Sequence, residues 1–149
     1  MGKFNLQEAL IERLYWLIRL RWIAVIGVFL AVLFASRVLK FSLPIFPLYA
    51  VAVTLGVYNL IFFLLLSPSE RKKSIKTINR IGNTQISLDL LSLAVLIHFS
   101  GGIETPFIFY FIFHMIIASI LLSRWASFLQ ATFAVLLFGL IVSLEYFGI

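Results

Sequence analysis

The segment PIFPLYAVAVTLGVYNLIFFLLL, residues 44–66, decides the fold class because it contains no charged side chain. An α-helix of about 20 apolar residues matches the hydrocarbon thickness of a bilayer. Comparable segments occur at 22–39, 82–99, 106–122 and 127–147. The sequence therefore predicts an all-α membrane protein, a bundle of about five transmembrane helices.

The composition of the whole chain agrees with this class. Of its 149 residues, 62% are hydrophobic and only 12% are charged, and the mean hydropathy is +1.10. A soluble domain of this length would need far more charged surface. Cysteine is absent, which excludes disulfides and thiolate metal sites within this chain.

Residues 1–20 are expected to form an amphipathic helix that lies in the membrane interface, on the cytoplasmic side, before the first span. The polar side chains Glu8, Glu12 and Arg13 lie opposite an apolar face. That face consists of Leu10, Ile11, Leu14, Leu17 and Ile18. The predicted organisation is this helix followed by a polytopic transmembrane domain over residues 21–149.

Lysine and arginine are distributed unevenly between the two sides of the predicted bundle. Ten of them lie on one side, in residues 1–21, in the loop at 71–80 and at Arg124, whereas only Arg37 and Lys40 lie on the other. The positive-inside rule therefore predicts a cytoplasmic N-terminus. The basic loop is interpreted as a flank held by anionic lipid headgroups, and no nucleic-acid role is expected so close to the membrane.

The stretch Gly101-Gly102-Ile103-Glu104-Thr105-Pro106-Phe107, here called the Gly101–Phe107 loop, is a polar break between the third and fourth predicted spans. Its adjacent glycines permit positive φ and a close approach of a ligand to the backbone. Thr105 followed by Pro106 is typical of a helix start, so free N–H groups should face the loop. The charge distribution places the loop outside the cytoplasm.

Asp89 is the acidic residue that lies well inside a predicted span. Intramembrane charges are rare and usually functional. The alternative is that Asp89 anchors its helix by pairing with Arg80 or by hydrogen bonding with Gln85, and both interpretations remain open. Gln130, near the start of the fifth span, is a candidate neighbour.

The two histidines do not predict a haem or a metal site. His98 lies at the outer end of the third span, and His114 lies about 12 Å along the fourth. Two ligands of one iron need similar depth, whereas these differ by roughly 10 Å. His98 is therefore the better candidate for a contact with another ligand, and His114 is expected to make an interhelical hydrogen bond.

The start of the fourth span is rich in aromatic side chains: Phe107, Phe109, Tyr110, Phe111 and Phe113. These side chains either face lipid near the membrane surface or form a flat apolar slot beneath the polar loop. A quinone fits the second arrangement, because its ring stacks on aromatic groups and its carbonyls accept hydrogen bonds.

The loop sequence GGIETPF closely resembles the quinone-binding motif GGxxNPF of redox-sensing histidine kinases of the RegB/PrrB type. The segment RLRWIAVIG, residues 19–27, is similar to the start of that family's first span. In those proteins the motif lies in an extracytoplasmic loop between the third and fourth of six membrane helices. Thr105 replaces the family's asparagine; it keeps a hydroxyl but lacks the paired donor and acceptor of an amide.

The resemblance implies the N-terminal transmembrane sensor domain of a two-component histidine kinase, which senses redox state through bound ubiquinone or menaquinone. The implied quinone ligands are Gly101, Gly102, Glu104, Thr105, Pro106 and Phe107, with His98 and Tyr110 as second choices. It also implies the bacterial inner membrane, a homodimer, and an attached kinase core that acts on a response regulator.

The chain lacks the catalytic and phosphoacceptor regions of a kinase, so it is not expected to be an enzyme. Five spans that start in the cytoplasm end outside it, and we expect a fragment cut before a sixth helix or, alternatively, a natural five-span protein. Two other functions compete with a sensor. One is a small transporter or channel-like protein with Asp89 and His114 on an ion path, and the other is a structural subunit in which the loop is only a turn.

Overall fold

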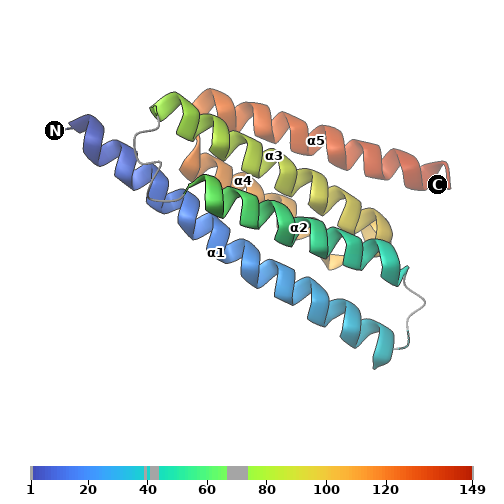
Figure 1. The fold of residues 1–149 in the computed structure, drawn as a ribbon. Coiled ribbons are helices and arrows are strands. Elements are labelled where there is room, and N and C mark those ends of the chain that lie inside the picture. Colours follow the sequence, from blue (N-terminus) through green and yellow to red (C-terminus); the bar gives the residue numbers. More distant parts are fainter. Residues whose placement is uncertain (1, 39, 41–43, 67–73, 149) are drawn as a thin grey trace.

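The computed structural model describes residues 2–38, 40, 44–66 and 74–148 (Figure 1). Its helices are α1 (Gly2–Arg37), α2 (Ile45–Leu65), α3 (Ile75–Phe99), α4 (Phe109–Leu121) and α5 (Arg124–Tyr146). Two short 3-10 helices, η2 (Gly102–Glu104) and η3 (Pro106–Ile108), lie between α3 and α4. No strand occurs among the residues that the structure describes. The predicted all-α class is confirmed.

The helices run along a common direction in one bundle, and α3 is its central member (Figure 1). This helix packs against each of the other four. Half of the most apolar stretch of α3 is buried, compared with 22–28% of the equivalent stretches of α1, α2 and α5. The central position of α3 therefore agrees with the polar residues that it carries, because polar groups inside a membrane protein need protein partners.

Among the residues that the structure describes, four helices are long and apolar enough to cross a membrane, namely Gln7–Arg37, Ile45–Leu65, Ile75–Phe99 and Arg124–Tyr146. The α4 helix is apolar but has only 13 residues. At 1.5 Å per residue it is about 20 Å long, which is shorter than a hydrocarbon core of about 30 Å. The fourth predicted span is therefore a short helix, and η3 extends it toward the end of α3.

The N-terminal segment is helical, as expected, and it continues without a break into the first predicted span. No proline or glycine occurs between residues 3 and 26, so nothing in the sequence interrupts α1 before the first span. The predicted apolar face packs into the bundle, where Leu14, Leu17 and Ile18 are buried. This face finds apolar partners because α3 begins at Ile75, seven residues before the predicted start of its span.

Most of the outer surface of the bundle is apolar. Large hydrophobic side chains are more than half exposed on α1, α2, α4 and α5, including Ile23, Val53, Phe109 and Val135. A soluble protein rarely exposes contiguous apolar patches of this kind, whereas a bilayer covers them. The distribution of exposed residues thus agrees with a multi-pass membrane protein.

Candidate functional site

The Gly101–Phe107 loop is compact and depends on both of its glycines. Gly101 has φ 114° and Gly102 has φ 64°, values in the region that side chains with a Cβ disfavour. The Thr105 Oγ1 hydroxyl donates to the carbonyl of Gly102 at 3.2 Å and closes the loop. Thr105 therefore does not cap α4 as predicted, because η3 separates it from that helix.

A carboxylate from α5 fixes the loop in place. The backbone N–H of Ile103 donates to Glu145 Oε1 at 2.9 Å. Gly102 is buried against the same side chain, and a Cβ built on Gly102 would coincide with the Glu145 carboxylate. Only glycine fits Gly102 in this packing, for a steric reason that is independent of its positive φ.

Glu145 is a residue that the sequence analysis missed. It lies near the end of the fifth predicted span, and no local pattern links it to a loop 42 residues earlier. One signal was present, because an isolated acidic residue at that end of an otherwise apolar span needs a partner. The backbone N–H of Ile103 is such a partner.

The other predicted loop residues differ in their surroundings. Glu104 is exposed, whereas Phe107 is partly buried and packs against the main core. Pro106 begins η3. His98 lies on the last turn of α3, where its Nδ1 atom is buried and has no hydrogen-bond partner in the described part of the chain. His98 Nδ1 is thus a buried polar atom near the loop without a hydrogen-bond partner among the described residues.

The aromatic side chains of α4 separate into two groups. Phe107, Tyr110 and Phe113 form a row, with ring centroids 6.1 Å and 5.9 Å apart at successive contacts. Tyr110 and Phe113 are exposed on the outside of the bundle, whereas Phe111 is buried against Phe138. The row begins at the loop and continues along the lipid-facing side of α4. It is therefore compatible both with lipid contact and with an apolar slot for a quinone ring.

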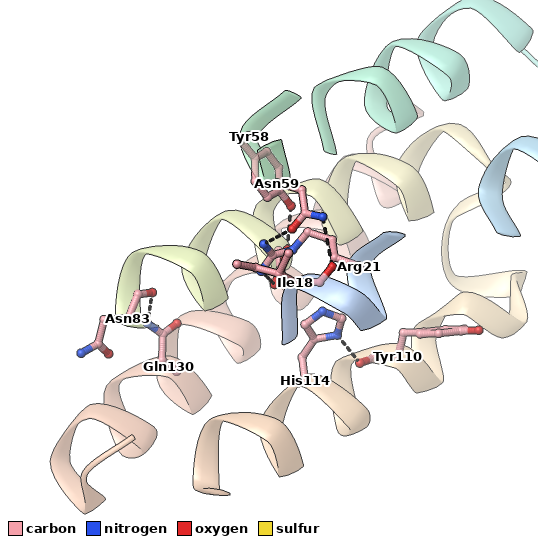
Figure 2. A network of polar contacts seen from close by, with 9 residues as sticks. Ile18, Arg21, Tyr58, Asn59, Asn83, Tyr110, His114 and Gln130 are labelled. Carbon is pink, nitrogen blue, oxygen red and sulfur yellow. Dashed lines mark hydrogen bonds and ion pairs between the residues drawn. The ribbon is translucent and has the colours of Figure 1, made fainter. Parts of the chain in front are cut away.

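Asp89 lies in a second polar site, deep in the bundle. Its Oδ2 atom is 2.7 Å from Arg21 Nη2, and its Oδ1 atom accepts a hydrogen bond from the Tyr58 hydroxyl at 2.6 Å. Arg21 Nη1 also donates to Asn59 Oδ1 at 2.9 Å, and Asn59 Nδ2 donates to the Ile18 carbonyl at 3.0 Å (Figure 2). We call Arg21, Tyr58, Asn59 and Asp89 the polar cluster; it joins α1, α2 and α3.

The polar cluster replaces the partners predicted for Asp89. Neither Arg80 nor Gln85 bonds to it; among the described residues, both amide atoms of the fully buried Gln85 lack a partner. Arg21 was assigned to the flank of the first span, but α1 begins near the N-terminus, so Arg21 lies in mid-helix. It is 4% exposed, and its guanidinium carbon lies 5.2 Å from the centre of the Tyr58 ring.

Gln130 contacts α3, although not at Asp89. Its Nε2 atom donates to the Asn83 carbonyl at 3.2 Å (Figure 2). The same atom also donates to the Ser87 Oγ atom at 2.8 Å. These bonds join α5 to the central helix within about two turns of Asp89. Polar contacts therefore connect α3 with α5 as well as with α1 and α2.

His114 makes a contact within its own helix rather than between helices. Its Nδ1 atom pairs with the Tyr110 carbonyl at 2.9 Å (Figure 2). Over the described residues, no hydrogen bond joins His114 to Asp89, which gives the predicted ion path no support. In the same part of the chain, no three histidine or acidic side chains lie close enough together to hold a metal ion.

Loss of the Arg21 guanidinium is expected to destabilise the bundle. The variant Arg21→Leu leaves the Asp89 carboxylate buried without its counter-ion, which costs about 3–5 kcal/mol in buried pairs. Arg19→Leu removes the same charge from an exposed position on the same helix and should change stability by less than about 1 kcal/mol. Unfolding of the purified protein in mixed micelles measures both; equal stability of the two variants would contradict a structural role for Arg21.

Comparison with known proteins agrees with a membrane sensor. Searches of curated proteins and of solved structures found no match. The family model described as the PilS-like transmembrane domain matches residues 4–148, nearly the whole chain. Domains of this type are the membrane parts of sensor kinases, and their function is sensory. The chain, with its apolar helices and its buried polar cluster, belongs to the family of PilS-like transmembrane domains.

Proposed function

We propose that this sensory domain responds to redox state by binding a quinone, either ubiquinone or menaquinone, at the Gly101–Phe107 loop. The Ile103 N–H carries the proposal: it already donates to a carboxylate oxygen, so it is oriented to bind an oxygen atom brought to the loop. The resemblance of the loop to GGxxNPF supports quinone as the source of that oxygen.

The surroundings of the loop suit the remaining parts of a quinone. His98 Nδ1 is a buried polar atom without a described partner, three residues before Gly101, and is available to a second oxygen. Phe107 and Tyr110 offer aromatic surface for the ring. Because Tyr110 and Phe113 are exposed on the outside of α4, an isoprenoid tail would lie along them in lipid. Gly101, Gly102, Glu104, Thr105 and Pro106 complete the proposed site by shaping its backbone.

A ligand at this loop would act on two helices directly. The loop continues from the end of α3, and it is bonded to α5 through Glu145. A ligand shifts the balance between two conformations only if it binds one of them more tightly. Displacement of the bond between Ile103 and Glu145 is a suitable source of that difference in affinity. In the proposal, the bundle forms a homodimer and regulates an attached kinase core that acts on a response regulator, while this chain itself is not an enzyme.

Removal of the Phe107 ring is expected to weaken quinone binding. Titration of the purified protein in lipid nanodiscs with decylubiquinone should give a Kd for Phe107→Ala roughly three- to tenfold higher than for the wild type, because one aromatic contact is lost. Phe109→Ala is the matched control, since Phe109 is 64% exposed and lies outside the loop. Equal affinities of the wild type and Phe107→Ala would exclude this ring from the site. Gly102→Leu is a poorer test because its side chain would collide with Glu145.

The proposal also places the protein in the bacterial inner membrane, with the N-terminus in the cytoplasm and the loop outside. The chain has no cysteine, so single introduced cysteines report their side of the membrane. In spheroplasts, Ile103→Cys should react with a membrane-impermeant maleimide, because Ile103 is 45% exposed in the loop. Ser74→Cys, at the exposed start of α3, should react only after permeabilisation. The opposite labelling pattern would reverse the orientation.

A further inference from the structure

The loop presents a hydrogen-bond donor and an anionic acceptor at the same point. The donor is the Ile103 N–H, and the acceptor is Glu145 Oε1, 2.9 Å away. The second carboxylate oxygen, Oε2, makes no hydrogen bond with any residue that the structure describes. The two groups come from different parts of the chain, because the donor follows α3 and the acceptor lies on the last turn of α5.

Gly102 keeps the carboxylate at this position. With any larger residue, a Cβ would occupy the space of the Glu145 carboxylate. The absence of a side chain at Gly102 therefore allows an acidic group to reach the loop backbone, where a ligand oxygen is expected to bind. Glu145 is thus placed within the proposed quinone site, although the resemblance to GGxxNPF does not include it.

The two redox forms of a quinone differ in what they offer to such a pair. The oxidised form has carbonyl oxygens, which only accept hydrogen bonds. The reduced form, a hydroquinone, has phenolic hydroxyls, which both donate and accept, as a tyrosine hydroxyl does. A hydroquinone hydroxyl can accept from Ile103 N–H while it donates to the Glu145 carboxylate, and a bond to a charged acceptor is strong. A quinone carbonyl can use only the N–H and would turn its lone pairs toward the carboxylate.

We propose that Glu145 determines the redox selectivity of the site, so that it binds the hydroquinone more tightly than the oxidised quinone. This inference rests on the proposed function, because it requires a quinone at the Gly101–Phe107 loop. Glu145 acts as a specificity-determining residue that discriminates a donor from an acceptor. The reduced ligand inserts between Ile103 and Glu145, and that insertion would separate the loop from α5.

The test compares decylubiquinol with decylubiquinone on the full chain in nanodiscs, titrated without oxygen. The wild type should bind decylubiquinol with the lower Kd. Glu145→Gln keeps the size of the side chain and its acceptor for Ile103, but replaces the charged acceptor partly by an N–H donor that suits a carbonyl. The ratio of the quinone Kd to the hydroquinone Kd should fall about tenfold in this variant. Glu12→Gln changes an exposed residue of α1 next to Arg13, which bonds to the Ile120 carbonyl at the far end of α4, and should leave the ratio unchanged.

The outcomes separate this inference from the function on which it rests. If the wild type binds neither form, the proposed quinone site fails. If the wild type binds the oxidised form as tightly as the reduced form, or if Glu145→Gln leaves the ratio unchanged, the selective role of Glu145 is overturned while the site stands. If Glu145→Gln does not fold, the ratio of the quinone Kd to the hydroquinone Kd in the wild type decides whether the site is redox-selective. Equal losses of both affinities in a folded Glu145→Gln would also overturn selectivity, because they indicate only a structural role.

Discussion

The buried ion pair between Arg21 and Asp89 is the constraint on which the rest of the bundle depends. Both side chains are at most 5% exposed in a protein whose surroundings are lipid. Charges in such a place are costly unless they are paired and their remaining hydrogen-bonding groups are satisfied. Tyr58 and Asn59 on α2 bond to Asp89 Oδ1 and Arg21 Nη1, whereas Arg21 Nε has no partner among the described residues. The relative depth and rotation of α1, α2 and α3 are therefore fixed together. A shift of α1 or α3 would separate the two charges, and a shift of α2 would remove their hydrogen bonds.

The central helix connects this ion pair to the Gly101–Phe107 loop. Asp89 and the contacts of Gln130 lie on the same α3 helix, which ends at Phe99 and continues into the glycines. The loop then meets α5 at Glu145, so α3 and α5 are joined near both the polar cluster and the loop. A conformational change at the loop would therefore act on α3 and α5. Polar contacts join α3 to α1, α2 and α5. This arrangement suits a sensor, because two packings of a connected bundle can differ by a few contacts.

The sequence predicted the helical class and the break between the third and fourth helices, because these depend on local apolar length and on glycine and proline. It did not predict the partners of the polar residues. Arg21 was assigned to a membrane flank because basic residues usually lie there; a search for a cation at the depth of Asp89 would have found it. Glu145 and Gly102 meet only through tertiary packing, which leaves no periodic signal. Thr105 was expected to cap a helix because the intervening turn of 3-10 helix has no distinctive sequence.

A double-mutant cycle at the ion pair tests the central claim most directly. The free energies of unfolding of Arg21→Leu, Asp89→Leu and the double variant are compared with that of the wild type in mixed micelles. We expect strong non-additivity, with the double variant more stable than the sum of the single losses predicts by more than about 1 kcal/mol, because it leaves no unpaired charge. Additive losses would contradict the account, since they would mean that Arg21 and Asp89 stabilise the bundle independently.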